Sequence, residues 1–542
     1  MKNMIDLYSA LDDPNFDGNV APKNIPAKKN IISNKKPSQN NYNKNSNYGA
    51  PVKKNVFGNK TNINNNNKNI KHISPTKKNT NNNKKLNSNN YIKNEIYEDN
   101  NFYAPMYEPI YNNPLSIFSS PKNEDNEEEE KNIIPGKQDI KSKIDIQKIE
   151  TVVKSLNDDK YIYKSIEELQ NVLKEISIKN NLNNEESQAF LVYCWITKNI
   201  SYYIGPRPDN TPLGALQKRI TQCSGYARLF KQLLKIFNIK SILVHGIGRT
   251  YNLSPKPNKE NHEWNAIKLN GEYYLCEVTW GAGKVENNKF VRSYNTFYFC
   301  CPPEIFINTH LPSSDLTHWT LLDKKISQEE FENLLYKDKF FYFYGFNDIK
   351  PREGVVKLNN NNTEVIITNN NQIKNLRLSC KVYFEHKLIE NISCIEKNNN
   401  YFSVNLIFNK KGNYNVLYFT TDKEGTVNSD LVARQQFVVT NNSKELKTFP
   451  TIFNFKDEIS IIEPKYNNLP KNREISFKFI SNEIYDMGVV IDKKCTHLKK
   501  VDNIFEGKFT IKGEEILVGK FDIDNPGNLK VMIKYKVKKL IY

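Results

Sequence analysis

A cysteine, a histidine and a carboxylate, the three residue types that together perform acyl transfer, stand in three neighbouring segments of the chain. Cys223 lies in the segment Thr221-Gln-Cys-Ser-Gly-Tyr-Ala-Arg-Leu-Phe230, where apolar residues at helical spacing predict a helix from about Gln222. The unpaired N–H groups and the positive dipole end of a helix N-terminus favour a thiolate over a thiol. Cys223 is therefore a candidate nucleophile, although an isolated cysteine at such a position is more commonly a small buried residue.

His262 begins a predicted β-hairpin that brings it close to Glu277. Asn270-Gly271 is a two-residue turn signal, which pairs Leu269 with Glu272 and places Trp264 opposite Glu277. His262 shares a face with Trp264, so Glu277 is its diagonal neighbour, about 7–8 Å away at the backbone. A carboxylate there can fix the imidazole tautomer and leave the other ring nitrogen facing a thiol. The alternative is that His262 and Glu277 are a surface histidine and a surface acid. The bulky Trp264 on the same face argues against this alternative.

The motifs in this part of the chain resemble the transglutaminase-like superfamily, and within it the kyphoscoliosis peptidase group. The resemblance covers about residues 185–322 and depends on CSGYARLF, on HEWNAIKLNGEYYLCEVTWGAG and on the fifteen-residue step from His262 to Glu277. The segments YCWITKNISY from Tyr193, PEIFINTHLP from Pro303 and WTLL from Trp319 also fit that group. The strand-rich second half resembles the immunoglobulin-like domains of the same group more loosely.

The resemblance implies a papain-like triad with Cys223 as nucleophile, His262 as base and Glu277 as the orienting acid. Glu277 stands where the family usually has Asp, which moves the carboxylate by more than an angstrom, and loss of orientation is expensive in catalysis. Gln222 is a second departure, because a small or apolar residue more often precedes the cysteine. It either crowds the site or supplies an oxyanion donor.

Two functions are compatible with this resemblance. The first is a cysteine peptidase, amidase or transglutaminase-like acyltransferase, in which water gives hydrolysis and a lysine amine gives a cross-link. The second is a catalytically weak or inactive scaffold that binds cytoskeletal or cytokinesis partners, since the superfamily includes members thought to act in cytoskeletal organisation. The expected partner is accordingly a protein substrate or a cytoskeletal protein, and whether the chain is an enzyme stays open.

Other reactive or aromatic residues have simpler explanations. Trp195, Trp264 and Trp280 lie in apolar patterns and are expected in the core. Cys300 and Cys301 could suggest zinc together with His245 and His310, but their spacing is poor, so we expect no metal site and no cofactor. Cys276 is expected to point away from Glu277 on its strand.

The pattern of elements predicts an α+β core in which helices pack on an antiparallel sheet. A capping box at Ser165-Ile-Glu-Glu168 begins one helix, and a second begins after Asn184. A third helix, with a buried stripe from Tyr226 to Phe237, ends at Asn238. Strands are predicted for 241–247, 263–269, 272–279 and 296–300.

Beyond Phe346 the chain consists of short alternating strands divided by Asn, Gly and Lys turns, which predicts β-sandwiches. The predicted strands are 363–368, 376–384, 401–408, 412–420 and 432–439, then 474–480, 486–491, 504–511, 514–521 and 528–535. We therefore expect a disordered Asn/Lys-rich tail (1–140), a transglutaminase-like domain (141–345) and two immunoglobulin-like β-sandwiches (346–445 and 446–542).

Composition limits the location and the partners. The chain has 542 residues and a formal charge of +18, with 17 Lys against four Asp from Met1 to Lys93. Ten acids against one Lys follow from Glu95 to Glu130. A basic arm can bind nucleic acid, but this one has no Arg and few aromatics, so we do not expect it to. Eight scattered Cys, no signal-peptide pattern and no long apolar run predict a cytoplasmic protein without a membrane span. The family resemblance implies an association with the cytoskeleton.

Overall fold

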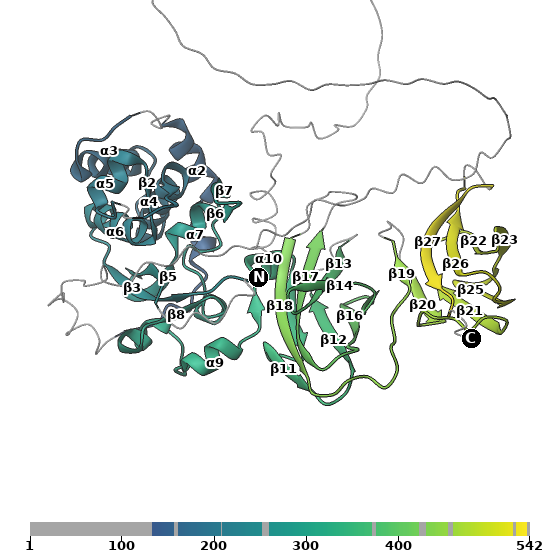
Figure 1. Ribbon diagram of the computed structural model, residues 1–542. Coiled ribbons are helices and arrows are strands. Elements are labelled where there is room, and N and C mark those ends of the chain that lie inside the picture. The colour runs from purple at the N-terminus through teal and green to yellow at the C-terminus, as the bar shows by residue number, and fades with distance from the viewer. Residues whose placement is uncertain are drawn as a thin grey trace, which may run out of the picture. The chain divides into compact units, whose positions relative to one another are not determined.

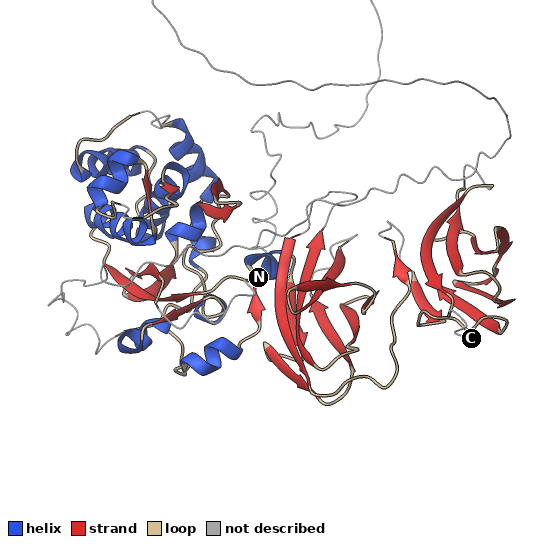
Figure 2. Ribbon diagram, viewed as in Figure 1, coloured by secondary structure: helices blue, strands red, loops and turns tan. Residues whose placement is uncertain are grey.

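The computed structural model describes residues 133–156, 161–206, 209–251, 260–370, 376–421, 430–453, 459–523 and 527–538 (Figure 1). Most of the predicted tail, up to residue 132, lies outside the described residues. The predicted fold class is confirmed for the rest: a transglutaminase-like core of helices on an antiparallel sheet is followed by two β-sandwiches (Figure 2). No helix in the described part of the chain has the length and apolar character that crossing a bilayer requires.

Helices form one layer of the first domain. The Ser165 half of the predicted capping box is present, since Ser165 accepts from the Glu168 N–H, while Glu168 Oε2 accepts from the Lys164 N–H. The second helix begins after Asn184 as predicted, and Asn184 accepts from the Ser187 N–H. Most of α4 is buried, as expected of a helix that is apolar on nearly all sides. The elements of this layer are η2 (Ile140–Lys143), α2 (Ile146–Ser155), α3 (Ile166–Lys179), α4 (Glu185–Asn199), α5 (Pro212–Lys218), α6 (Cys223–Leu234) and η3 (Lys235–Phe237).

A four-stranded antiparallel sheet forms the other layer, in the order β5-β4-β3-β8. Its strands are β3 (Ser241–Gly248), β4 (His262–Leu269), β5 (Glu272–Cys276) and β8 (His310–Pro312). Helix α6 packs against β3 and β4. Alternate residues of β4 face two different cores, with Ile267 and Leu269 in the helix-side core and Trp264 and Ala266 in the core on the opposite face. Strand β4 is therefore buried on both faces, which fixes its register firmly.

Smaller elements surround this sheet. Two short strand pairs are β1 (Ser201–Tyr202) with β2 (Ile220–Thr221), and β6 (Gly283–Glu286) with β7 (Lys289–Arg292). The remaining helices of this region are α7 (Val278–Ala282), α8 (Pro303–Phe306), η4 (Ser314–Thr320) and α9 (Gln328–Asn333).

Two strand predictions for this domain were wrong in detail. The strand predicted for 272–279 ends at Cys276, because Glu277 caps the helix α7 that follows. The strand predicted for 296–300 is a turn in which Cys300 has a φ of 45°. Residues 133–140, assigned to the tail, include a segment that runs along β5, where the Gly136 N–H donates to the Tyr273 carbonyl at 2.9 Å.

The first β-sandwich has the strand order of an immunoglobulin domain. One sheet runs β10-β12-β16-β15 and the other β11-β18-β17-β13-β14, with β11 parallel to β18. This order corresponds to strands ABED opposite the G, F and C strands. Tyr414 in β17 donates its hydroxyl to the Lys410 carbonyl at 2.9 Å, as a tyrosine corner does. The elements are β9 (Tyr336–Lys337), α10 (Lys339–Phe343), β10 (Phe346–Lys350), β11 (Val355–Leu358), β12 (Asn362–Asn369), β13 (Arg377–Phe384), β14 (Lys387–Ile389), β15 (Ser393–Lys397), β16 (Tyr401–Ile407), β17 (Gly412–Thr421) and β18 (Asp430–Val439).

The second β-sandwich is similar, with sheets β19-β27-β26-β22-β23 and β20-β21-β25-β24. Its strands are β19 (Thr451–Ile452), β20 (Ser460–Glu463), β21 (Glu474–Ile480), β22 (Met487–Ile491), β23 (Lys494–His497), β24 (Lys499–Val501), β25 (Ile504–Thr510), β26 (Glu515–Phe521) and β27 (Leu529–Lys536). Each sandwich has its own apolar core. The domain boundaries stay predictions, and Leu335, Phe341 and Tyr344, just before Phe346, already pack in the first sandwich's core.

Candidate active site

Cys223 is the first residue of α6 and is only 6% exposed. Gln222 precedes it in an extended conformation and gives the helix no side-chain cap, so its first N–H groups are left without that partner. The first turn packs tightly on the preceding strand, because a Cβ added at Gly225 would lie 1.8 Å from Thr221 Oγ1. The sequence Thr-Gln-Cys-Ser-Gly therefore fixes where the helix begins and holds Cys223 at its positive end.

Gln222, which the sequence left as either a crowding residue or an oxyanion donor, uses its side-chain amide elsewhere. Its Nε2 donates to the carbonyls of Tyr203 and Gly205, at 3.4 and 3.2 Å. The amide therefore fastens the loop after β1 to the start of α6.

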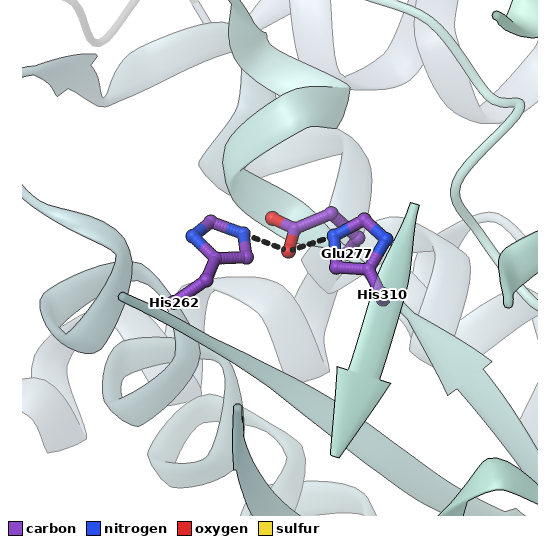
Figure 3. Close-up of side chains that lie close together, drawn as sticks. All are labelled: His262, Glu277 and His310. Carbon is purple, nitrogen blue, oxygen red and sulfur yellow. Dashed lines mark hydrogen bonds and ion pairs between the residues drawn. The ribbon is translucent and has the colours of Figure 1, made fainter. Parts of the chain in front are cut away.

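His262 begins β4 and is 5% exposed. The predicted hairpin register is confirmed, since Leu269 pairs with Glu272 and Asn265 pairs with Cys276. His262 Nε2 lies 2.6 Å from Glu277 Oε2, the distance of a strong charge-assisted hydrogen bond (Figure 3). Nδ1 is the ring nitrogen left for another partner.

Glu277 is completely buried and uses both carboxylate oxygens. Its Oε1 accepts from the N–H groups of Thr279 at 2.6 Å and Trp280 at 3.1 Å, which caps α7, while Oε2 faces His262. A carboxylate held at a helix N-terminus is fixed in orientation and stabilised by the dipole. The extra methylene of Glu over Asp is therefore accommodated by a side chain that caps a helix and contacts an imidazole at once.

Burial and charge act in opposite directions on this pair. Burial favours the neutral His262 ring, but the charge of Glu277, hydrogen bonding with Cys223 and Glu277 and the charge of Cys223 hold the pKa of His262 well above its ordinary value. Burial alone would raise the pKa of Glu277, but His262 and His310 hold it far below its ordinary range. The favoured state is therefore a His262 imidazolium beside a Glu277 carboxylate. Like Glu277, the Cys223 side chain raises the pKa of the His262 ring.

A second histidine, His310, completes the group around Glu277 and was not among the predicted site residues. It is the first residue of β8, is 1% exposed, and its Nε2 lies 3.5 Å from Glu277 Oε2 (Figure 3). The sequence raised His310 only as a zinc candidate with Cys300, Cys301 and His245. Its position in the family-like segment from Pro303 to Pro312 was the available signal, but no local pattern connects β8 to the hairpin.

The residues of that rejected zinc grouping are divided between different contacts. His245 lies 3.7 Å from Glu260, and Cys300 Sγ lies 3.9 Å from Cys276 Sγ. Within the described residues, the three potential metal ligands that come together are instead His262, Glu277 and His310, whose donor atoms lie within 4.8 Å of one another.

Aromatic rings surround the two histidines. Trp264 is 1% exposed and its ring centre lies 6.2 Å from His262, whereas Trp195 is wholly buried in the helix-side core. Trp280 differs from the core position expected of it, since it is only partly buried and lies 5.5 Å from His262 and 4.4 Å from His310. These rings exclude water from the imidazole–carboxylate contact and strengthen it.

Chemically, the arrangement suits general base and acid catalysis beside a thiol. Ser224 Oγ donates to Glu263 Oε2 at 3.1 Å, which ties the first turn of α6 to the residue after His262. The segment with the cysteine and the strand with the histidine are thus joined one residue away from each.

Comparisons with known proteins match this region. The transglutaminase-like superfamily matches residues 174–278. The mouse (Mus musculus) protein named kyphoscoliosis peptidase is 28% identical over 37% of this chain and 33% of its own length. Its human (Homo sapiens) namesake is 30% identical over 32% of this chain and 28% of its own length. The matches thus span about a third of these relatives.

Among solved structures, a chimeric titin Z1Z2 tandem covers 34% of this chain and 94% of its own, at 9% identity and a TM-score of 0.11, too low to support any argument. The family match is different in kind, because residues 174–278 include Cys223, His262 and Glu277. Residues 174–278 thus match the transglutaminase-like superfamily, and this part of the chain is similar to the proteins named kyphoscoliosis peptidase.

Proposed function

We propose that this chain is a cysteine-dependent acyl-transfer enzyme, a peptidase or amidase, that acts on protein substrates. Cys223 is the nucleophile, His262 is the general base and acid, and Glu277 orients and charges His262. The observation that carries the proposal is the buried contact of 2.6 Å between His262 Nε2 and Glu277 Oε2, with Cys223 among the groups that raise the pKa of that ring.

The proposed reaction has two steps. The Cys223 thiolate attacks a carboxamide or peptide carbonyl, the C–S bond forms, and N–H groups at the start of α6 stabilise the oxyanion. His262 gives its proton to the leaving amine as the C–N bond breaks. In the second step His262 takes a proton from water, which attacks the thioester and releases the acid, or from a lysine amine, which gives a cross-link instead.

Selective alkylation tests this proposal. We expect iodoacetamide to modify Cys223 faster than any of the other seven cysteines, as measured by peptide mapping of the native chain. The variant His262→Ala should slow the modification of Cys223 by about tenfold or more, because it removes the imidazolium that stabilises the thiolate. His497→Ala, in the second sandwich, is the matched control and should leave the rate unchanged. Equal labelling of Cys223 in the native chain and His262→Ala would contradict the proposed role.

A scaffold function is the second candidate, and the burial of the reactive groups favours it. Cys223 and His262 are 6% and 5% exposed, so a substrate carbonyl needs a movement of the surrounding segments to reach the sulfur. In this alternative the transglutaminase-like domain and the two sandwiches bind cytoskeletal protein partners in the cytoplasm without catalysis. Labelling of Cys223 no faster than that of the other buried cysteines would favour the scaffold.

A further inference from the structure

Glu277 Oε2 lies between two imidazoles, and the second has no place in the three-residue triad. His310 enters from β8, which pairs with β3 through Gly248, while His262 pairs with Gly246 on the other edge of β3. His310 Nε2 is 3.5 Å from Glu277 Oε2, and its Nδ1 is 2.8 Å from Thr309 Oγ1 (Figure 3). The ring also stacks on Phe306, with ring centres 4.2 Å apart, so its orientation is fixed on several sides.

The distances favour a hydrogen-bonded group over a metal site. A metal ion with ligands at about 2.0–2.2 Å keeps neighbouring ligand atoms roughly 3 Å or more apart. His262 Nε2 and Glu277 Oε2 are 2.6 Å apart, which is the distance of a hydrogen bond and too short for two ligands of one ion. A proton therefore joins His262 and Glu277, whereas His310 Nε2, 3.5 Å from Glu277 Oε2, is a buried ring nitrogen that aims at the carboxylate without a regular hydrogen bond.

Electrostatics select one tautomer of His310. Thr309 Oγ1 has one proton, and it can go to the Phe306 carbonyl, 3.3 Å away, or to His310 Nδ1. The first choice would leave a lone pair on His310 Nε2 facing a buried carboxylate, which is repulsive. The second puts the imidazole proton on Nε2, where it points at Glu277. The carboxylate therefore favours the second arrangement.

His310 is a neutral imidazole, so its Nε2–H can point at Glu277 without adding a positive charge to the site. Burial lowers the pKa of His310 to about 4, although Glu277 acts to raise it. His310 is therefore neutral at neutral pH, and the buried site holds one imidazolium and one carboxylate. Two further ionisable groups act on the His262–Glu277 pair. Glu263 interacts with the charge of His262. Tyr298, whose pKa lies well above its ordinary value, interacts with the charge of Glu277.

We propose that His310 is a positioning residue whose Nε2–H points at Glu277 Oε2, fixes that oxygen between two imidazoles, and moderates the negative charge that His262 experiences. This inference rests on the proposed function, because it concerns the same site. The carboxylate keeps its place without His310, since Oε1 is still held by the Thr279 and Trp280 N–H groups. Loss of the His310 proton donor then leaves more charge on Oε2, and His262 holds its own proton more tightly.

The test is the pKa of His262, measured by NMR of the full chain with labelled histidine and assigned by its loss in His262→Gln. We expect His310→Phe, which keeps a flat ring without a donor, to raise this pKa by about 0.5 unit or more, about threefold in proton affinity. His310→Gln retains an N–H donor and should stay within about 0.2 unit of the native value. His497→Phe, the same replacement in the second sandwich, should also leave it unchanged.

His310→Leu keeps the test independent of whether His310→Phe folds. Leucine has no N–H donor, so the Nε2–H is lost as in His310→Phe, and the pKa of His262 should rise by a similar amount. An unchanged or lowered pKa in these variants, or an equal rise in His310→Gln, would overturn the proposal. The measurement needs no reactivity at Cys223, so it separates failure of this inference from failure of the proposed function.

Discussion

At the scale of single residues, Glu277 makes two contacts that depend on the length of its side chain. One oxygen caps α7 and the other meets His262, so the carboxylate has little freedom to move. An Asp at this position would retract the carboxylate by more than an angstrom from a partner now at 2.6 Å. The longer side chain of Glu277 thus suits its position, because Glu277 directly follows the last residue of β5 and is also the N-cap of α7.

Replacement of Glu277 tests this fit directly. We expect Glu277→Asp to slow alkylation of Cys223 by about tenfold, because a retracted carboxylate no longer holds His262 in position. Glu277→Gln, which keeps the length but removes the charge, should slow it at least as much. Faster alkylation in Glu277→Asp than in the native chain would show instead that the native carboxylate is poorly placed.

The contact between His262 and Glu277 could be predicted from the sequence for a physical reason. The Asn270-Gly271 turn determines a register, and a register determines which side chains are diagonal neighbours, so His262 and Glu277 could be paired from local rules. His310 could not, because its contact with Glu277 depends on β8 joining the far edge of β3, a long-range pairing of Gly248 with His310 that no local rule predicts. The capping role of Glu277 was also missed, since the apolar alternation of the strand appeared to continue to Thr279.

At the scale of elements, the start of α6 determines where the sulfur lies. Gly225 allows the helix to approach Thr221, and the buried Thr221 hydroxyl bonds the Asp209 carbonyl and Asn210 Oδ1 at 3.0 Å each. The contact between Ser224 and Glu263 then ties that turn to β4. The position of Cys223 is therefore a property of the packing between β2, α6 and β4 and not of one side chain.

We expect Gly225→Ala to displace the first turn of α6 and to destabilise the chain by about 1–3 kcal/mol, as overpacking does. The added Cβ would meet Thr221 Oγ1 at 1.8 Å. Urea unfolding followed by tryptophan fluorescence measures the loss, and alkylation of Cys223 reports the displacement. Thr221→Ala combined with Gly225→Ala should recover part of the stability, since the clashing oxygen is gone. Purely additive effects of the two changes would contradict the contact.

The strands that could be predicted from the sequence are those whose own residues carry a clear hydrophobic alternation. Long strands that alternate, such as β12, β17 and β21, were identified to within about two residues. Edge strands such as β11, β14 and β24 were not, because three or four residues that are exposed or half-exposed carry too little hydrophobic pattern. Their place is determined by the neighbouring strand.

At the scale of the whole molecule, the buried site connects folding stability to pH. A buried histidine whose folded pKa is lowered stays neutral while the unfolded chain takes up a proton, so stability falls as pH decreases through the unfolded value. The pKa of His310 is lowered to about 4 from an ordinary 6.5. This shift should therefore reduce the free energy of unfolding of the chain by about 3 kcal/mol in total as the pH falls from 6.5 to 4. His262 acts oppositely, because its raised pKa gives stability at low pH that is lost as pH rises through the folded value.

Urea midpoints measured from pH 6.5 down to pH 4.5 should decrease in the native chain and decrease less in His310→Phe. Glu277, whose folded pKa is lowered, loses its contribution only as pH falls below its unfolded value near 4.5, so it acts outside this window. Buried carboxyls with raised pKa, such as Asp338, act in the opposite direction and are common to both proteins. Equal slopes in the native chain and in His310→Phe would show that His310 does not titrate as described.

The central claim is that Cys223 accepts an acyl group with the help of His262. The most direct measurement is mass spectrometry of the intact chain after brief exposure to an activated ester such as p-nitrophenyl acetate, followed by peptide mapping. We expect one acetyl group on Cys223 in the native chain, little or none in His262→Ala, and normal acetylation in the control His497→Ala. Acetylation that avoids Cys223, or that is equal in His262→Ala, would contradict the claim.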